Sequence, residues 1–340
     1  MREDDRVCAL RAWLTTALPG AGAGPGMILS SASVDASFRR YFRVARGTET
    51  WVAMDAPPPR EDCRPFVTVA ALLRDAGLNA PRVLAQDLER GFLLLTDLGT
   101  RTYLDALKAA DAASADRLFR DALDALIVWQ RSTRDGVLPA YDAALLEREL
   151  ALFPEWYIAR HLGVALTGAE QGALAEVGAK LVAVALAQPR VFVHRDYMPR
   201  NLMVCEPNPG VLDFQDAVLG PIAYDVVSLF RDAFLSWEEA RVLDWTARYW
   251  EGARAAGLPV HADFGAFYRD FEWMGLQRHL KVLGIFARLN YRDGKPDYLA
   301  DAPRFIGYAR AVAQRYGELA PLARLLDRLE ARVPATGYTF

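Results

Sequence analysis

The stretch that most constrains the fold of this chain is VFVHRDYMPRNLMV, residues 191–204, where a short apolar run ends in a dense group of charged and amide side chains. Its last four residues and the apolar segment GVLDF are separated by CEPNP, a sequence typical of a turn. A strand, a polar loop and a hairpin are therefore predicted between residues 191 and 214. Polar groups at strand ends are costly to bury unless they are paired or bind a ligand.

The side chains that would meet at one end of this hairpin are His194, Asp196, Asn201 and Asp213. Phosphoryl transfer needs such a set, because one carboxylate must orient the attacking hydroxyl and accept its proton while other groups hold Mg²⁺ against the nucleotide phosphates. Magnesium prefers hard oxygen ligands, which asparagine and aspartate both provide. The alternative is a polar turn closed by Asp and Asn side chains.

The order of these residues matches the kinase signature H-R-D-x-x-x-x-N, followed by an aspartate on the next hairpin. The segment GVLDFQDAVLGPIAYDVVSLF then places Gly220-Pro221 and Asp225 before a helical pattern. With these motifs the chain resembles the aminoglycoside phosphotransferase and choline kinase-like family over about residues 30 to 290, most clearly between 191 and 230.

This resemblance implies a role for each matching position. Asp196 would be the catalytic aspartate, and Asn201 and Asp213 the ligands of Mg²⁺, with ATP as the phosphate donor. Asp225 would be a buried support that hydrogen-bonds the catalytic loop, and His194 would be structural because the mechanism needs no imidazole.

The distribution of patterns predicts an α+β, bilobal, protein-kinase-like fold. With 340 residues, 52% of them apolar, the chain exceeds the usual size of a single-core domain. Strand patterns dominate from 30 to 98, around one helix at 64–76, and long helices are predicted at 102–132, 142–160, 168–187 and beyond 224. We expect a small β-rich N-lobe at 1–98, preceded by a helical pattern at its start, and a helical C-lobe at 99–340.

The small lobe departs from the kinase pattern, which has a strand lysine held by a helix glutamate. In TWVAMDA the corresponding residue is Ala53, Met54 or Asp55, none of them basic, and the helix at 64–76 contains no glutamate. Both members of the lysine–glutamate ion pair are missing together, which indicates that other residues have taken over its role rather than that one position has been lost.

Three arginines near the phosphate-covering turn are candidates for the missing cation. In SFRRYFRV, strand alternation places Phe38, Arg40 and Phe42 on one face and Arg39 and Arg43 on the other. Arg40 is preferred because it shares a face with the two phenylalanines; the alternative is that all three arginines are solvated surface charges.

Other nucleotide contacts are predicted around this strand. SSASVDAS, which ends at Ser37, would offer hydroxyls and backbone N–H groups to the phosphates, or is merely a flexible turn. By resemblance to the family, the backbone of Thr96, Asp97 and Leu98 in GFLLLTDLG would bind the adenine edge. Trp51 could stack on the base, although a strand tryptophan is more often a core residue.

The acceptor site is expected in the helical lobe, facing Asp196. An arginine fork suits a carboxylate on the acceptor, and Arg231 is a candidate whose alternative is an ion pair with Asp232 or Asp225. The predicted acceptor-binding residues are Tyr197, Arg200, Gln215 and Arg231.

Longer strings, such as SASVDASFRRYFRV, APPPREDCRPFV and HRDYMPRNLM, resemble the anomeric amino-sugar kinases of bacterial cell-wall recycling. That resemblance implies phosphorylation of N-acetylmuramate and N-acetylglucosamine at the 1-hydroxyl. Open alternatives are a phosphotransferase for aminoglycosides, choline or another small alcohol, a nucleotide-binding pseudokinase, and a metal-dependent hydrolase using His194, Asp196, Asp213 and Asp216.

Composition narrows the remaining classes. A net charge of −3 argues against a nucleic-acid-binding surface. Cys8, Cys63 and Cys205 form no CxxC pair, so neither a disulfide framework nor a zinc site is expected. The charged start MREDDRVCAL and the short apolar runs predict neither a signal peptide nor a membrane span. We expect a cytoplasmic enzyme with a small-molecule partner; the sequence does not give its oligomeric state.

Overall fold

A computed structural model describes residues 4–19, 26–33, 38–58 and 60–330. Ser37, predicted to bind nucleotide, lies outside the described residues. The chain forms two compact units, Met1–Trp129 with Arg200–Ala217, and Gln130–Pro199 with Val218–Phe340. The compact units are defined by packing and do not test the lobe boundary expected between residues 98 and 99, which stays a prediction.

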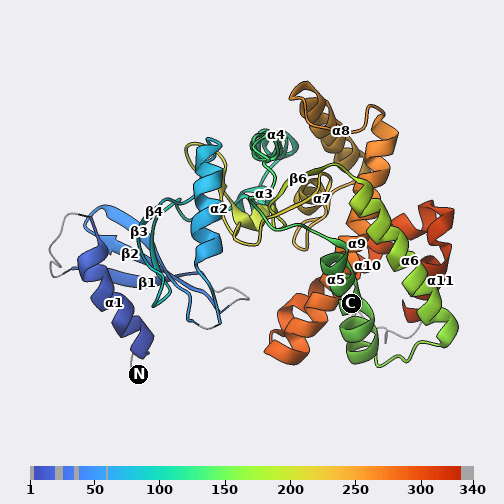
Figure 1. The fold of residues 1–340 in the computed structure, drawn as a ribbon, viewed down its shortest axis with the longest axis horizontal. Helices are drawn as coiled ribbons and strands as arrows, with labels where there is room; N and C mark the ends of the chain where they lie inside the picture. Colours follow the sequence, from blue (N-terminus) through green and yellow to red (C-terminus); the bar gives the residue numbers. More distant parts are fainter. Residues whose placement is uncertain (1–3, 20–25, 34–37, 59, 331–340) are drawn as a thin grey trace. The chain divides into compact units, whose positions relative to one another are not determined.

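The first unit is built on an antiparallel five-stranded sheet in the order β1-β2-β3-β5-β4 (Figure 1). Its strands are β1 (Ile28–Ser33), β2 (Arg40–Arg46), β3 (Glu49–Asp55), β4 (Val83–Asp87) and β5 (Phe92–Thr96). The α+β prediction is confirmed, and so are the strands expected around residues 40–55 and 83–96. The first four residues of the predicted phosphate-covering loop SSASVDAS belong instead to β1.

Helix α1 (Asp5–Ala17) covers one face of this sheet. The helix begins where the Asp4 side chain accepts a hydrogen bond from the Arg6 N–H, which satisfies one of its unpaired N-terminal donors. Its apolar stripe, with Leu10 and Leu14, packs against Val44 of β2 and Trp51 of β3. The N-terminal helical pattern is therefore a sheet-covering helix.

Three further helices belong wholly or mainly to this unit. α2 (Arg64–Asp75) begins with a proline at its first turn and matches the predicted helix. The single helix predicted at 102–132 is wrong, because α3 (Tyr103–Lys108) ends before α4 (Ala112–Arg131). Asp111 explains the break, since its carboxylate accepts a hydrogen bond from the Ser114 N–H at 2.8 Å and starts a new helix.

The hairpin predicted after the catalytic motif is present. β7 (Leu202–Met203) pairs antiparallel with β8 (Gly210–Val211), after the short 3-10 helix η2 (Pro199–Asn201). Asn208 in the turn donates to the Asp121 carboxylate of α4 at 2.6 Å and to the Tyr103 hydroxyl at 2.8 Å. These bonds fix the hairpin against the helices of its own unit.

The second unit is helical around one small strand pair, β6 (Arg190–Val193) with β9 (Val218–Pro221). The sequence analysis did not predict β9. The predicted helix at 168–187 is α6 (Gly168–Ala187), which begins with a capping box between Thr167 and Glu170. The predicted helix at 142–160 is instead α5 (Ala143–Leu152) followed by a π-helix, η1 (Phe153–His161), whose second residue, Pro154, has no N–H to donate.

Helix α9 (Phe264–Asp293) is the central element of this unit (Figure 1). Its buried side chains share a core with α6, η1 and the two C-terminal helices. No helix among the described residues is both long enough and apolar enough to cross a membrane. The remaining elements are α7 (Tyr224–Phe230), α8 (Glu239–Ala255), η3 (Pro296–Asp301), α10 (Ala302–Arg315), η4 (Gly317–Leu319) and α11 (Ala320–Glu330).

Candidate active site

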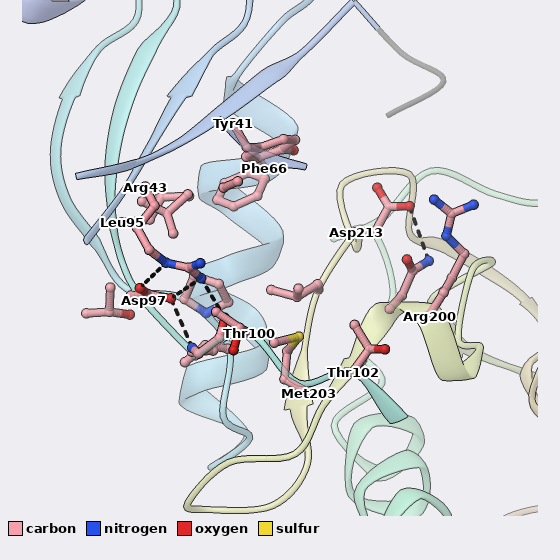
Figure 2. Close-up of a pocket in the computed structure, with 18 residues that line it drawn as sticks. Tyr41, Arg43, Phe66, Leu95, Asp97, Thr100, Thr102, Arg200, Met203 and Asp213 are labelled. Carbon is pink, nitrogen blue, oxygen red and sulfur yellow. Dashed lines mark hydrogen bonds and ion pairs between the residues drawn. The ribbon is translucent and has the colours of Figure 1, made fainter. Parts of the chain in front are cut away.

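A pocket of about 270 Å³ opens in the first unit, on the sheet face opposite α1. Figure 2 shows Arg43 and Asp97 on one side of it and Asp213 and Arg200 on the other. The wall between them is largely apolar. The residues of β2, β3, α2 and β5 that form this wall beside Arg43 are Tyr41, Val52, Phe66 and Leu95.

The segment that follows β5 forms one side of the pocket, and it contains the predicted adenine-binding residues Thr96, Asp97 and Leu98. Arg43 holds this segment, because its Nε and Nη2 atoms donate to the Asp97 carboxylate at 2.7 and 3.0 Å, and Nη2 also donates to the Gly99 carbonyl at 2.7 Å. Burial works to raise the pKa of the Asp97 carboxyl, but Arg43 and the Gly99 N–H hold it below its usual value. Arg43 therefore fixes the shape of this end of the pocket.

Asn201 and Asp213 lie together at the opposite end of the pocket. The Asn201 side-chain amide donates to Oδ2 of Asp213 at 3.2 Å, and the Gln215 amide donates to Oδ1 at 2.9 Å. The Leu212 N–H donates to the Asn201 carbonyl at 2.9 Å, which closes this end of the hairpin. Asp213 has a φ of 61°, a left-handed conformation that aspartate tolerates better than most residues.

This donor set fits a magnesium ion. One carboxylate and one amide oxygen are the ligands expected for Mg²⁺, which keeps several waters or phosphate oxygens in its coordination sphere. Within the described ranges no cluster of three or more His, Cys, Asp or Glu side chains could hold a metal by itself. The predicted hydrolase site at His194, Asp196, Asp213 and Asp216 is therefore not a ready metal cluster.

The loop that contains Asp196 is held by a buried carboxylate in the second unit. Asp225, fully buried, accepts hydrogen bonds from the His194 N–H at 2.7 Å and the Arg195 N–H at 3.0 Å. Burial raises the pKa of Asp225 to about 7, although the two backbone donors act in the opposite direction. Arg195 has a φ of 75°, so a strained turn depends on this support.

The predicted catalytic residue, Asp196, is partly exposed on this loop, whereas its neighbours point inward. His194 and Tyr197 are both buried, with their rings edge to face at 5.6 Å, and the Asp196 N–H donates to His194 Nδ1 at 3.3 Å. His194 is thus packed as a structural residue. Tyr197, predicted to bind the acceptor, is only 2% exposed.

A buried ionic cluster behind the loop was not predicted from the sequence. Glu149 of α5 accepts hydrogen bonds from Arg195 Nη2 at 2.5 Å, from Lys281 Nζ at 2.8 Å and from the Tyr141 hydroxyl. Lys281 also donates to the Tyr224 hydroxyl at 3.0 Å. Despite burial, the two cations lower the pKa of Glu149, so its carboxylate is ionised. The sequence feature that could have indicated this cluster is a charged residue, Glu149 or Lys281, among the buried positions of each of two helices.

The comparisons with known proteins agree with this geometry. The chain matches the model of the phosphotransferase enzyme family over residues 29–264. It belongs to that family. Two curated relatives are named N-acetylmuramate/N-acetylglucosamine kinase: one from Pseudomonas putida, 57% identical over 91% of this chain and 91% of the relative, and one from Pseudomonas aeruginosa, 57% identical over 97% and 98%.

A solved structure gives the same fold at low sequence identity. The GDP complex of aminoglycoside 2′-phosphotransferase-IIIa aligns over 92% of this chain and 100% of that protein, with a TM-score of 0.61 and 14% identity. The bilobal kinase-like fold is therefore confirmed, and a phosphotransferase of this family uses a nucleotide as its substrate.

Two predicted nucleotide contacts lie away from the phosphotransferase pocket. Arg40 donates through Nε to the Asp55 carboxylate at 3.0 Å and pairs with Asp4. Trp51 belongs to the core under α1. Both residues stand on the α1 face of the sheet, whereas the pocket is on the opposite face, so neither lines the pocket, and their nucleotide contacts stay predictions.

The predicted acceptor residues are dispersed. Arg200 lines the pocket near Asp213 (Figure 2). Gln215 is buried, and its side-chain amide donates to the Asp213 carboxylate. Arg231 is buried, lies over the Phe271 ring at 4.9 Å and approaches Glu272 at 3.6 Å. Its ion pair is therefore with a residue of α9 and with neither of the two aspartates considered for it.

Proposed function

We propose that this protein is an ATP- and Mg²⁺-dependent kinase that phosphorylates the 1-hydroxyl of N-acetylmuramate and N-acetylglucosamine in peptidoglycan recycling. The observation that carries the proposal is the 57% identity to relatives named for this activity, over more than nine-tenths of the chain. We place the enzyme in the cytoplasm, where ATP is available.

The nucleotide would occupy the pocket of the first unit. Its base would lie against Thr96, Asp97 and Leu98, whose geometry Arg43 fixes, and its phosphates would extend toward Asp213. Asn201 and Asp213 would hold Mg²⁺, which offsets negative charge on the phosphates when it is bound.

Asp196 would orient the sugar 1-hydroxyl and accept its proton. A bond forms between the sugar oxygen and the γ-phosphorus, and the bond from that phosphorus to the β-phosphate oxygen breaks, which releases ADP and the sugar 1-phosphate. Asp196 suits this role because it is partly exposed while its backbone neighbours are anchored by Asp225.

The contacts to the sugar are a finer part of the proposal. Arg200 is the best-supported of the predicted acceptor residues, because it lies at the Asp213 end of the pocket and a guanidinium can bind the lactyl carboxylate of N-acetylmuramate with two donors. Tyr197, Gln215 and Arg231 stay predictions, and each of them is buried.

An ATP-consumption assay with four acceptors tests the proposal. N-acetylglucosamine, N-acetylmuramate, choline and kanamycin are supplied in parallel, and the product is identified by ³¹P NMR. A sugar 1-phosphate signal supports the proposal. Turnover with choline or kanamycin alone keeps the kinase and rejects the sugar, and ATP binding without any turnover favours the pseudokinase.

A further inference from the structure

The proposed kinase needs a cation at the phosphates, and the usual strand lysine is absent. Within the part of the chain that the structure describes, no lysine lines the pocket. On the pocket face, β3 presents Val52 and Met54, which pair across the sheet with Arg43 and Tyr41. Arg43 is engaged with Asp97 at the base end of the pocket. The cation for the phosphate end must therefore come from another residue.

The pairing of β2 with β3 identifies which arginines face the pocket. Arg40 lies opposite Asp55, and both belong to the face that α1 covers. Tyr41, the next residue, lines the pocket. Arg39 precedes β2 by one residue, and alternation continued beyond the strand would put it on the same side as Tyr41.

Arg39 has a carboxylate partner, Glu61, in the segment just before α2. Its Nε lies 3.9 Å from Oε2 of Glu61, and the Phe38 N–H donates to Oε1 of the same carboxylate at 3.1 Å. The Arg39 and Glu61 side chains are only 11% and 17% exposed, so this pair is largely shielded from solvent. Glu61 precedes α2 by three residues, so it lies outside the helix in which the usual glutamate was expected.

Arg39 has acidic neighbours besides Glu61. Burial acts to lower the pKa of Arg39, but neighbouring acidic groups, Asp213 and Asp216 among them, raise it above its ordinary value. A permanently charged guanidinium is suited to bind the β- and γ-phosphates of a nucleotide.

We propose that Arg39, positioned by Glu61, is the phosphate-binding cation of this enzyme and replaces the missing lysine–glutamate pair. Arg39 would donate to the triphosphate, while Glu61 holds both the guanidinium and the Phe38 N–H in place. The inference rests on the proposed function only in requiring a nucleotide triphosphate, and it is independent of the acceptor sugar.

Calorimetric titration of the full chain with MgATP and with adenosine tests this role. Because a charge-assisted hydrogen bond is lost, Arg39→Ala should weaken MgATP binding by about 10- to 100-fold while leaving adenosine affinity unchanged within about twofold. Arg39→Lys should recover part of the loss, and Glu61→Gln should show a smaller loss with the same selectivity. Arg64→Ala, which removes an exposed arginine from the same segment, is the matched control and should bind both ligands like the wild type.

Each outcome decides between the phosphate role and a structural one. Equal weakening of MgATP and adenosine would assign Arg39 to the fold and overturn the proposal, and so would an ATP-selective loss in Arg200→Ala with none in Arg39→Ala. If Arg39→Ala does not fold, the same comparison is made with Arg39→Gln. A wild-type chain that binds MgATP but phosphorylates no sugar refutes the proposed function alone, whereas one that binds no MgATP refutes both.

Discussion

Glu149→Gln should be among the most destabilising single changes in this protein, although it alters the side-chain volume very little. Glu149 is 5% exposed, and it is the carboxylate partner of both Arg195 and Lys281. These three groups carry one net positive charge, and the substitution leaves two buried cations with no anion between them. Breaking a buried ion pair in this way costs about 3–5 kcal/mol.

The same cluster predicts an asymmetry between its members. Lys281→Met leaves Glu149 paired with Arg195 and should cost less, about 1.5–3 kcal/mol, because it removes the charged hydrogen bond to Glu149 together with the weaker one to the Tyr224 hydroxyl. The double variant, Glu149→Gln with Lys281→Met, retains a single buried cation. It should therefore be more stable than Glu149→Gln alone by about 1–2 kcal/mol, since coupled neighbours are not additive.

Urea unfolding followed by tryptophan fluorescence measures these differences. Glu176→Gln is the control, because it breaks a Glu–Lys pair at the same 2.8 Å separation on the surface of α6, where the loss should stay below about 0.5 kcal/mol. If Lys281→Met proved as damaging as Glu149→Gln, or if the second substitution deepened the defect, the charge argument would be refuted.

Three further predictions concern glycine packing, pH and the catalytic carboxylates. Gly284→Ala should destabilise the protein by about 3 kcal/mol or more, because the added Cβ would lie 2.4 Å from the Leu152 carbonyl carbon. Gly178→Ala, whose Cβ would have its nearest atom 3.9 Å away, should instead stabilise α6 by about 0.5–1 kcal/mol, and thermal unfolding measures both changes. The folded pKa of Asp225 is about 7 and its ordinary value is 3.8, so between these values the folded state keeps a proton that the unfolded chain has released. The free energy of unfolding should therefore fall as pH rises from about 4 to about 7, by up to ~4 kcal/mol. Denaturant titrations across this pH range should show a flatter slope for Asp225→Asn. Asp196→Asn should remove most turnover and leave ATP binding nearly intact, whereas Asp213→Asn should weaken Mg²⁺-dependent nucleotide binding itself; turnover of Asp196→Asn within about tenfold of wild type would reject the assigned base.

The catalytic hairpin could be predicted from the sequence because its determinants are local. The strand, the polar loop and the turn that contain Asp196 and Asp213 lie within 24 residues, and their order alone carries the pattern. The cluster around Glu149 could not be predicted in this way. Its partner Lys281 is 132 residues distant in the chain, and only the packing of α5 against α9 brings the two charges together.

The choice among the arginines shows how a correct local pattern can leave an assignment open. Alternation along β2 correctly separates Arg40 from Tyr41 and Arg43. It does not say which face α1 will cover, because Leu10 and Trp13 of that helix come from a distant part of the chain. Of the two phenylalanines that favoured Arg40, Phe42 packs against the core under α1, whereas Phe38 is 56% exposed, and the pocket lies on the face of Tyr41 and Arg43.

Asp55, one of the three residues considered for the lysine position, is committed to holding the fold. Asp55 ends β3 fully buried on the α1 face, where it accepts hydrogen bonds from Arg6 of α1 and Arg40 of β2, each through Nε at 3.0 Å. A lysine there would meet two guanidinium groups and lose both ion pairs, which like-charge repulsion and burial make unfavourable. With that end of β3 committed to fixing α1 on the sheet, we propose that the phosphate-binding charge comes from outside β3, from Arg39, which is adjacent to Arg40 and pairs with Glu61.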